Sequence, residues 1–284
     1  MKLDKNTKIL IVGLGLIGGS YAKALTKKGY KVKAITRSAS SIDYAMKNGL
    51  IEYGTTEVSK ELIQESEFII FSLYPKVFID WIEKYQEYFS PGTILTDVTG
   101  VKGSVVYEVQ DILRDDVEFI SAHPMAGREV YGVENSDERI FYGANYIVTP
   151  TEKNTENAIE QCERLGEILC FANISRLTPE EHDDMIGFLS QLTHCIAVTL
   201  MTCNDSEKLE AYTGDSFRDL TRIAKINDAM WSELFMMNKE ALLGHMDSFQ
   251  REFEKLKDML KNDDIEGMRE MMRRSTERRT MFDK

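Results

Sequence analysis

The sequence predicts an α/β protein: a mostly parallel sheet with helices on both faces, followed by an all-helical domain. Two observations support this prediction. In the first half, short β-branched runs alternate with helical segments, and a glycine-rich turn follows the first run. From about residue 176 the apolar residues recur instead at helical spacing. With 284 residues, 43% of them hydrophobic, the chain is long enough for two domains, which we place at 1–175 and 176–284.

The chain opens with a strand, a glycine turn and a helix. Residues 8–12, Lys-Ile-Leu-Ile-Val, are a short, mostly β-branched run, and a Gly-x-Gly-x-x-Gly pattern follows them. The segment 20–28 has helical character, and a second strand at 30–35 completes a βαβ unit of roughly 30 residues. In this Rossmann-type context the glycines permit the tight turn, the approach of a pyrophosphate and close helix packing. The residues expected to bind a dinucleotide here are Gly13, Gly15, Leu16, Ile17 and Gly18.

The end of the second strand bears on the choice of nicotinamide cofactor. An NAD site usually has Asp or Glu about 20 residues after the glycines, to bind the ribose 2′-hydroxyl. This chain has Thr36, Arg37 and Ser38 at that place, and the nearest downstream acid is Asp43. Because a guanidinium with two hydroxyls suits a 2′-phosphate, we favour NADP over NAD. The alternative is that Arg37 stacks on the adenine or points into water.

Later strands should bring further residues to the cofactor. They are expected at 68–73, 93–96, 119–122 and 144–148, with a last one at 170–174. In a parallel sheet, ligands bind beyond the carboxyl ends of the strands. The residues at these strand ends that we expect to face the cofactor crevice are Leu73, Tyr74, Asp97, Thr99 and His123.

The second half is predicted to be helical. Thr178-Pro-Glu-Glu181 combines an N-cap residue, proline at the first helical position and glutamate at the third, which indicates a helix start. Further helices are expected from near Ser216 and from Asp228, the last continuing for many turns into a charged, solvated tail. Because one layer of helices leaves apolar faces uncovered, we expect a homodimer through this domain.

Composition and charge exclude several classes of function. The 47 acidic and 35 basic residues give a net charge of −12, which disfavours sequence-independent binding to nucleic acid or to an anionic membrane. The four cysteines show no Cys-x-x-Cys spacing, so we expect buried, reduced thiols and no metal site. The N-terminus has no signal-peptide core, and no apolar run reaches the ~20 residues of a membrane span. A soluble, cytoplasmic protein is therefore predicted.

His123 stands apart from the other three histidines of the chain. It follows a predicted strand and precedes a Pro-Met-Ala-Gly turn, where the nicotinamide of a bound cofactor is expected. An imidazole at this place can accept the proton of a substrate hydroxyl as hydride leaves the same carbon. A structural role in the turn is the alternative.

On the helix that starts at Thr178, His182 could cap the early turns, and His194 could face either the crevice or the core.

Two arginines, Arg218 and Arg222, lie four residues apart on one predicted helical face. Like charges at that spacing repel each other unless an anion or an acidic side chain lies nearby. A guanidinium is well shaped to bind a carboxylate by two parallel hydrogen bonds, so both arginines are candidates for substrate binding. The alternative is that they pair with Asp215 or Asp219 on a solvated face.

Five strings occur in order along the whole chain: GLGLIGGS, LTDVTGVKGSV, HPMAGREVYG, LTPEEHDDM and FRDLTRIAKINDAMW. In this combination the sequence resembles the prephenate dehydrogenase family and its arogenate-using relatives in tyrosine biosynthesis. The resemblance implies that His123 hydrogen-bonds the ring 4-hydroxyl of prephenate, that Arg222 binds the ring carboxylate, and that His194 contributes to the substrate pocket. The implied reaction transfers hydride to NADP or NAD and releases carbon dioxide, giving 4-hydroxyphenylpyruvate.

The chain departs from the family pattern at two positions. Relatives commonly have Asp-x-Gly-Ser-x-Lys, whereas this chain has Asp97-Val-Thr-Gly-Val-Lys102, so the serine hydroxyl is absent from its usual position. We expect Thr99 to reach the same place from one residue earlier and count it with His123 as catalytic. The other departure is Asp215, in a stretch that tends to be glycine-rich in relatives. It could attract the ammonium of arogenate or offset a neighbouring arginine.

Three other functions stay open. An arogenate dehydrogenase would give tyrosine directly. A β-hydroxyacid or imine reductase has a similar architecture, but such enzymes tend to rely on a lysine in the helical domain, and no comparable motif is found there. A non-catalytic module that senses NADP(H) would bind the cofactor without turnover. The motifs favour a dehydrogenase that acts on prephenate.

Overall fold

The computed structural model describes residues 2–128 and 130–283. It separates into two compact units, of which one ends at Asn238 and the other begins at Lys239. The first unit holds two sheets with their covering helices and a further set of helices, and the second is a helical hairpin. The predicted boundary near residue 175 separates two kinds of secondary structure inside the first unit, and it stays a prediction of domain organisation.

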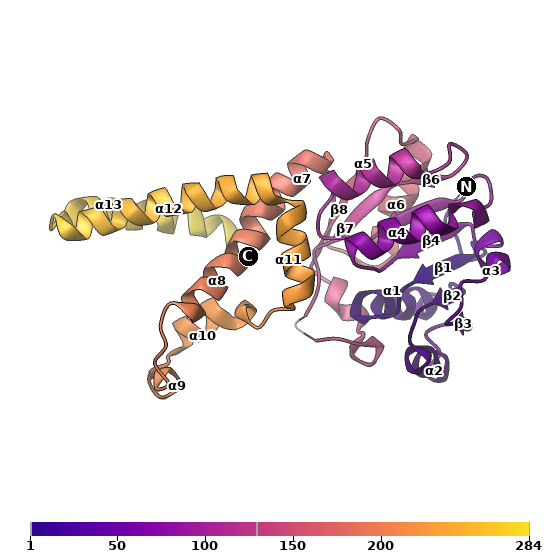
Figure 1. The fold of residues 1–284 in the computed structure, drawn as a ribbon, viewed down its shortest axis with the longest axis horizontal. Helices are drawn as coiled ribbons and strands as arrows, with labels where there is room; N and C mark the ends of the chain where they lie inside the picture. Colours follow the sequence, from indigo (N-terminus) through magenta and orange to yellow (C-terminus); the bar gives the residue numbers. More distant parts are fainter. Residues whose placement is uncertain (1, 129, 284) are drawn as a thin grey trace. The chain divides into compact units, whose positions relative to one another are not determined.

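In the described part of the chain the larger sheet has six parallel strands (Figure 1): β1 (Ile9–Val12), β2 (Val32–Ile35), β3 (Tyr53–Thr55), β4 (Phe68–Phe71), β5 (Ile94–Asp97) and β6 (Glu118–Phe119). Their order is β3-β2-β1-β4-β5-β6. In such a sheet the ligand binds where the strand order reverses, which here is between β1 and β4. The structure confirms the strands predicted at 8–12, 30–35, 68–73 and 93–96. β3 was not predicted because three residues with a central glycine show no period.

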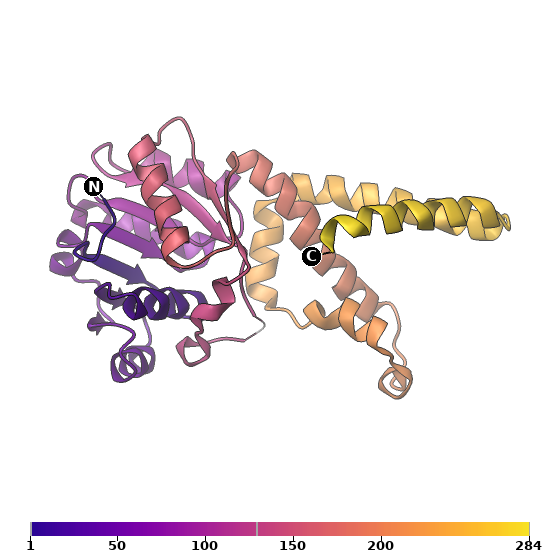
Figure 2. The same cartoon turned by 180° about the vertical axis from the view of Figure 1, so that it is seen from behind.

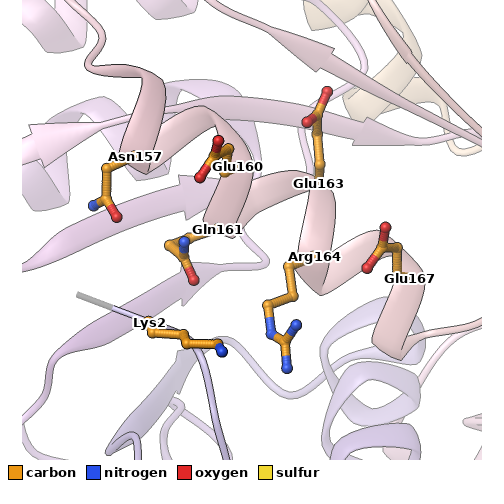
Figure 3. A pocket seen from close by; sticks show the side chains of 7 residues that line it. All are labelled: Lys2, Asn157, Glu160, Gln161, Glu163, Arg164 and Glu167. Atoms are coloured by element: carbon orange, nitrogen blue, oxygen red, sulfur yellow. The ribbon is translucent and has the colours of Figure 1, made fainter.

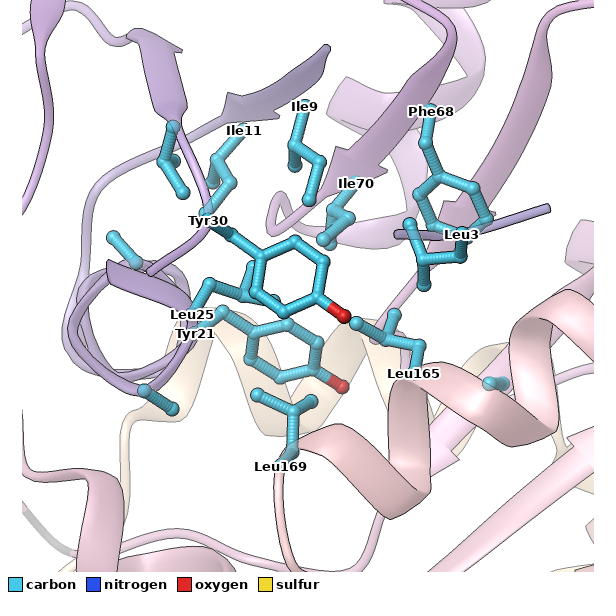
Figure 4. Packing of buried hydrophobic residues seen from close by; sticks show 14 of the residues in the cluster. Leu3, Ile9, Ile11, Tyr21, Leu25, Tyr30, Phe68, Ile70, Leu165 and Leu169 are labelled. Atoms are coloured by element: carbon cyan, nitrogen blue, oxygen red, sulfur yellow. The ribbon is translucent and has the colours of Figure 1, made fainter. Parts of the chain in front are cut away.

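Helices cover both faces of this sheet (Figures 1 and 2): α1 (Leu16–Lys27), α2 (Ala39–Lys47), α3 (Lys60–Gln64), α4 (Pro75–Tyr85), α5 (Gly103–Ile112) and α6 (Glu156–Ile168). Successive residues of a strand point to opposite faces, so Ile11 and Leu10 belong to two different core clusters. Figure 4 shows the cluster of Ile11, in which Tyr21 of α1 and Leu165 of α6 pack on the sheet. The cluster of Leu10 contains side chains of α4 and α5.

A second sheet follows, with β7 (Ser121–Pro124), β8 (Asn145–Thr149) and β9 (Asn173–Arg176) in that order. β7 pairs antiparallel with β8, and β8 pairs parallel with β9. The prediction of one strand over 119–122 is therefore wrong. The Ile120 N–H still bonds to the backbone of β5, but Ala122 donates to the Asp97 side chain instead, and the strand leaves the first sheet there. The last strand was expected at 170–174 and begins later, because Cys170 has a positive φ of 65° and forms a turn.

After β9, the described elements of the first unit are helical: α7 (Pro179–Ile186), a π-helical segment η4 (Gly187–Leu192), α8 (Thr193–Thr202), α9 (Leu209–Tyr212), α10 (Asp215–Thr221), a 3₁₀ turn η5 (Arg222–Ala224) and α11 (Asp228–Met237). Three further 3₁₀ turns lie earlier in the chain: η1 (Gln86–Tyr88), η2 (Val133–Asn135) and η3 (Glu138–Phe141). The predicted start of α7 is confirmed: Glu181 N–H donates to the Thr178 hydroxyl, and the Glu181 carboxylate accepts from Thr178 N–H. The helix from Asp228 does not continue for many turns, because Asn238 leaves helical geometry at φ −118° and ψ 30°.

The second unit consists of α12 (Lys239–Lys261), α13 (Ile265–Arg279) and a short 3₁₀ turn η6 (Thr280–Phe282). Asp263, with a positive φ of 52°, turns the chain between the two helices. Asp264 then caps α13 by accepting a hydrogen bond from Gly267 N–H at 2.9 Å. The predicted charged tail therefore folds back as a hairpin.

One stretch of helix, Pro179–Thr202, is long and apolar enough to cross a membrane by length and composition, contrary to the prediction. Only 28% of its most apolar window is buried. The exposed apolar side chains on it are Met185, Phe188, Leu189 and Met201. Length and apolar composition are also shared by helices that pack in soluble proteins, so the finding alone does not indicate a membrane protein.

The cysteines only partly match the prediction of buried thiols. In the described chain all four are free, Cys162 is buried and Cys195 is half-buried, whereas Cys170 and Cys203 are exposed. The prediction is therefore wrong for two of them. Cys170 is exposed because it occupies the turn after α6 rather than the predicted strand.

Candidate active site

A cavity of about 630 Å³ lies in the first unit, at the carboxyl ends of the strands. One wall comes from the sheets and the glycine turn, and the other from η4, α8 and α11. Eight of the residues predicted for the site line it: Gly15, Leu16, Ile17, Leu73, Tyr74, Thr99, His123 and His194. The structure thus brings the predicted cofactor turn, the candidate base and a helical histidine to one place.

A second depression of about 460 Å³, shown in Figure 3, has a structural role. Charged and amide side chains of α6 line it together with Lys2. Two of them hold the N-terminal segment: Gln161 accepts from Leu3 N–H, and Arg164 donates to the Leu3 carbonyl, both at 2.6 Å. The depression is a junction between the chain start and α6.

The three glycines of the turn have different roles. Gly13 has φ +100°, and a Cβ on it would lie 2.3 Å from the Ser72 carbonyl oxygen. A Cβ on Gly18 would lie 2.0 Å from the Gly13 carbonyl oxygen, so both positions exclude a side chain for packing reasons. At Gly15 no atom lies within 4 Å of such a Cβ. Gly15 is also the N-cap of α1 and provides no side-chain cap, and the first turn carries no acid. The turn therefore leaves room and free N–H groups for a pyrophosphate.

The residues at the end of β2 lie outside the described lining of the cavity. The Thr36 hydroxyl accepts from Leu14 N–H at 3.4 Å, which ties the end of β2 to the glycine turn. Ser38 caps α2 by accepting from Ser41 N–H at 3.1 Å. Arg37, between them, is exposed. The role of these three residues in cofactor binding stays a prediction.

Asp97 was expected to bind the cofactor, but it is fully buried and its oxygens are occupied. One oxygen accepts from Thr99 N–H at 3.0 Å, and the other accepts from Ala122 N–H at 3.2 Å. The ammonium of Lys102, also fully buried, lies 2.9 and 3.1 Å from the two oxygens, and the Ser121 hydroxyl donates as well. Burial lowers the pKa of Lys102, and the Asp97 carboxylate opposes that effect. Asp97 therefore joins β5 to β7, and its contact with a cofactor stays a prediction.

Thr99 lies on the cavity wall, but its hydroxyl is turned toward Asp97. The same hydroxyl lies 3.0 Å from the Val101 carbonyl and 3.3 Å from the Lys102 ammonium. With only 4% of its surface exposed, Thr99 presents little to a ligand. Its catalytic role stays a prediction, and in this conformation its hydroxyl serves the Asp97 network, by which we mean Asp97, Thr99, Lys102 and Ser121.

His123 is on β7, and a second histidine lies behind it. Nδ1 of His123 is 2.9 Å from Nε2 of His182, and Nδ1 of His182 is 2.8 Å from a carboxylate oxygen of Asp183. Burial lowers the pKa of His123 well below its ordinary value, and the neighbouring His182 and Lys102 lower it further. Burial also lowers the pKa of His182, against the effect of Asp183. Both imidazoles are therefore neutral at neutral pH, as a proton acceptor must be.

On the helical wall, His194 stacks on Trp231, with ring centroids 3.7 Å apart and an interplanar angle of 30°. Its Nδ1 is 2.9 Å from the Ser190 carbonyl in the π-helical segment. Apolar side chains surround this pair on the cavity wall: Ile186, Ile226, Met230 and Leu234. Of the two environments considered from the sequence, His194 therefore occupies the crevice.

The two predicted arginines are not among the described residues that line the cavity. Arg218 is exposed and lies 3.3 Å from Asp215, which is the alternative pairing. Arg222 is exposed in η5, directly before the lining residue Ile223. The basic side chains that do line the cavity are Arg128 and Lys225. Asp215 is thus paired with an arginine, which weakens the argument that it binds an ammonium group.

The sequence did not indicate that His182 and Asp183 lie behind His123. Both are in the LTPEEHDDM string, and the capping box fixes where that helix starts. The helix start alone, however, does not show that His182 points at His123, since the two are 59 residues apart. The signal that could have found them is an adjacent His-Asp pair on the first buried turn of a helix.

Comparison with known proteins decides the family. Residues 21–169 match the family described as prephenate dehydrogenase, nucleotide-binding domain, and residues 178–274 match the one described as prephenate dehydrogenase, dimerization domain. The chain belongs to the prephenate dehydrogenase family. The prephenate dehydrogenase of Bacillus subtilis (strain 168) is 31% identical over 267 residues, which make up 92% of this chain and 72% of that protein. The predictions of family, fold class and oxidoreductase function are confirmed.

Solved structures of prephenate dehydrogenases have the same fold as this chain. The crystal structure of prephenate dehydrogenase from A. aeolicus in complex with hydroxyphenyl propionate and NAD+ has a TM-score of 0.90 at 30% identity, and the match covers 99% of this chain and 100% of that one. Synechocystis arogenate dehydrogenase has a TM-score of 0.84 at 24% identity, over 97% of this chain and 100% of that one. The second likeness concerns the fold alone, so the fold does not choose between the two substrates.

Proposed function

We propose that this chain oxidises and decarboxylates prephenate to 4-hydroxyphenylpyruvate, using a nicotinamide cofactor. The observation that carries the proposal is the position of His123. It faces a cavity that is bounded by the dinucleotide turn and by the stacked pair of His194 and Trp231. The relative from A. aeolicus was solved with hydroxyphenyl propionate, a phenol with a short acidic side chain like the proposed product.

The glycine turn fits a dinucleotide, as the open space at Gly15 and the uncapped start of α1 indicate. Gly15, Leu16 and Ile17 would hold its pyrophosphate, while Leu73 and Tyr74 at the end of β4 would bound the nicotinamide half. When bound, the nicotinamide accepts hydride from the ring carbon that carries the hydroxyl.

His123 handles the proton of the ring hydroxyl. The neutral imidazole accepts a hydrogen bond from that hydroxyl and takes up its proton while the ring carbon is oxidised, so the oxygen carries no positive charge. The electrons of the bond to the ring carboxylate then enter the ring as carbon dioxide leaves. The ring becomes aromatic, the proton returns from His123 to the phenol oxygen, and the imidazole is neutral again. The apolar helical wall excludes water and aligns the ring.

The carboxylates of prephenate require cations. The family resemblance assigns the ring carboxylate to Arg222, and within this chain Lys225 is the nearby cation on the cavity wall. We propose that these two residues share the binding of the substrate carboxylates, and that Arg218 is dispensable because it pairs with Asp215. Separate Arg222→Met and Lys225→Met variants should each raise the prephenate KM by about 10- to 100-fold, with Arg218→Met as the matched control. An unchanged KM in both variants would contradict the assignment.

NADP is the proposed cofactor, with NAD as the alternative. Arg37 is exposed beside Thr36 and Ser38, and Asp43 on α2 is the nearest following acid. If Arg37 binds a 2′-phosphate, Arg37→Met should lower kcat/KM for NADP by about 10- to 100-fold and leave that for NAD unchanged. Equal losses with both cofactors would instead support stacking of Arg37 on the adenine.

We also propose a homodimer, for which the match to the dimerization domain is the main support. Large apolar side chains are exposed on the helices of this half, among them Phe188, Leu189, Leu220 and Met236. Sedimentation over a wide range of concentration tests this, and a monomer mass throughout would reject it.

The exposed thiols Cys170 and Cys203 accord with a reducing compartment, and we propose a cytoplasmic location.

The first experiment is a set of initial rates at the absorbance of the reduced nicotinamide, with NAD or NADP and with prephenate or arogenate. We expect turnover with prephenate, and a loss of about 10²- to 10⁴-fold in kcat for His123→Asn. Faster turnover with arogenate would favour the second candidate, an arogenate dehydrogenase. Absence of turnover in all four mixtures, from protein that binds cofactor, would overturn the proposal in favour of a sensing module or another reductase.

A further inference from the structure

His182 and Asp183 lie outside the cavity lining, yet they are aligned behind the candidate base. His182 is fully buried on α7, and its ring lies between His123 on one side and Asp183 on the other. Asp183 is next to it in sequence and is also buried. We propose that His182 and Asp183 are positioning residues that hold His123 in the one tautomer able to accept a proton from substrate, a role that rests on the proposed function.

Two backbone N–H groups hold the carboxylate of Asp183 in place. One oxygen accepts from Lys102 N–H and the other from Gly103 N–H, both at 2.7 Å. These groups are at the start of α5, where free N–H groups and the helix dipole favour a negative charge. A Cβ on Gly103 would lie 3.0 Å from the nearer oxygen, so the glycine permits this close approach. Asp183 is therefore fixed as an acceptor.

The tautomer of His182 follows from that acceptor. Its Nδ1 lies 2.8 Å from Asp183, and a carboxylate with no proton can only accept, so the hydrogen must be on Nδ1. A neutral imidazole carries one N–H, which leaves Nε2 of His182 without a hydrogen. Nε2 is the atom that faces His123 at 2.9 Å.

The tautomer of His123 follows in the same way. Because Nε2 of His182 can only accept, the hydrogen between the two rings must belong to Nδ1 of His123. The remaining nitrogen of His123, Nε2, then has a free lone pair for the substrate hydroxyl. When it takes up the proton, His123 becomes an imidazolium, and the charge is stabilised through His182 by Asp183. A histidine without this support would exist partly as the other tautomer, whose Nε2–H donates and cannot take a proton.

A neighbouring contact keeps α7 in place for this task. The side-chain amide of Asn238 donates to the Asp183 backbone carbonyl and to the Gln191 side chain, both at 2.8 Å. Gln191 itself donates to the Leu234 carbonyl on α11 at 3.2 Å. In α7, the side chain and the backbone carbonyl of Asp183 are thus both held by hydrogen bonds.

Nitrogen NMR of the free protein tests the tautomers without substrate. The chain has only four histidines, so ¹⁵N-histidine labelling gives few signals, and the His123→Asn and His182→Gln variants assign them. At pH 7.5 we expect Nδ1 protonated and Nε2 bare in both His123 and His182. A protonated Nε2 in His123 would overturn the inference whether or not the enzyme acts on prephenate.

Steady-state kinetics measures how much the tautomer of His123 contributes to kcat. His182→Leu removes the acceptor behind His123 and should lower kcat by about 10- to 100-fold, as when an outer hydrogen-bond partner of a working imidazole is removed. The prephenate KM should stay within about twofold, because His182 does not line the cavity. His182→Gln keeps an acceptor oxygen and should recover part of the loss. Glu180→Gln, which changes an exposed carboxylate on the same helix, is the matched control.

The outcomes separate this inference from the proposed function. Lower kcat with partial recovery in His182→Gln, at equal thermal stability, supports the positioning role. A His182→Leu protein that melts earlier but keeps wild-type kcat would show a structural role only and would overturn the inference. If wild type shows no turnover with prephenate while the NMR tautomers are as expected, the proposed function fails and the hydrogen-bond chain remains.

Discussion

The two walls of the cavity are built differently. On the sheet wall, two polar side chains have a buried polar partner behind them: His182 lies behind His123, and Asp97 lies behind Thr99. On the helical wall, the ring of His194 stacks on Trp231 among apolar side chains, and its Nδ1 lies 2.9 Å from a backbone carbonyl, that of Ser190. The comparison indicates that the sheet wall fixes protonation states, which need hydrogen bonds, while the helical wall fixes the shape and dryness of the substrate site.

The largest effect should come from Lys102→Met, which removes the cation from the Asp97 network. Asp97 would keep a buried charge without its partner, and such a loss costs about 3–5 kcal/mol. Urea unfolding followed by circular dichroism measures it. Lys153→Met, which breaks the exposed ion pair with Asp111, should leave the midpoint nearly unchanged. Similar midpoints for both variants would mean that the sheet wall does not depend on this network.

Next in size is the contrast between Gly18→Ala and Gly15→Ala. At Gly18 the new methyl group collides with the Gly13 carbonyl, so we expect a loss of about 1–3 kcal/mol in stability. At Gly15 the methyl group enters open space, so stability should change little while the cofactor Kd rises. Thermal melting and fluorescence titration with NADP or NAD measure the two effects. A Gly15→Ala protein that binds cofactor normally would argue against the pyrophosphate site.

On the helical wall, Trp231→Leu should act on binding. Loss of the stacked ring is expected to cost about 0.5–1.5 kcal/mol, which is about 2- to 12-fold in the prephenate KM. The other tryptophan, Trp81 on α4, packs on Phe71 of β4, and Trp81→Leu is the control that should lower stability without raising KM. If Trp231→Leu lowered kcat as much as His123→Asn does, the helical wall would contribute to the chemical step and not only to the shape of the substrate site.

The smallest effect that we expect is the change in the free energy of unfolding with pH near pH 7. The pKa values of His123 and His182 are lowered in the folded protein from the usual 6.5, so below that pH the unfolded chain binds more protons. Stability should therefore be level above pH 7 and fall as the pH drops below 6.5. Urea midpoints between pH 8 and pH 5 measure this, and His123→Asn should reduce the slope. A midpoint that rises on acidification would show that the imidazoles gain protons on folding.

Local signals made most of the fold predictable, and half of the expected site residues line the cavity. The glycine turn, the capping box at Thr178 and the position of His123 are encoded within short stretches, and the structure has them where expected. The partnership of His123 with His182 depends on tertiary packing, so no short stretch reveals it.

Two of the expected site residues have partners that the sequence does not reveal. Asp97 has the sequence position of a cofactor ligand, but the fold buries it against Lys102. Arg218 has the spacing of an anion site, but Asp215 three residues earlier pairs with it. In both cases the residue type was informative, while its partner was set by contacts that a linear pattern does not contain.

The number of residues in the π-helical segment Gly187–Leu192 determines the direction in which the following side chains point. In an α-helix each residue advances the side-chain direction by about 100°. Removing one residue from this segment would therefore hardly shorten the helix, but it would rotate everything after it, so that His194 would point away from the Trp231 ring while His182 stayed in place. Members of the family that differ by one residue here should thus differ in which side chains face the substrate, even where every other residue is shared.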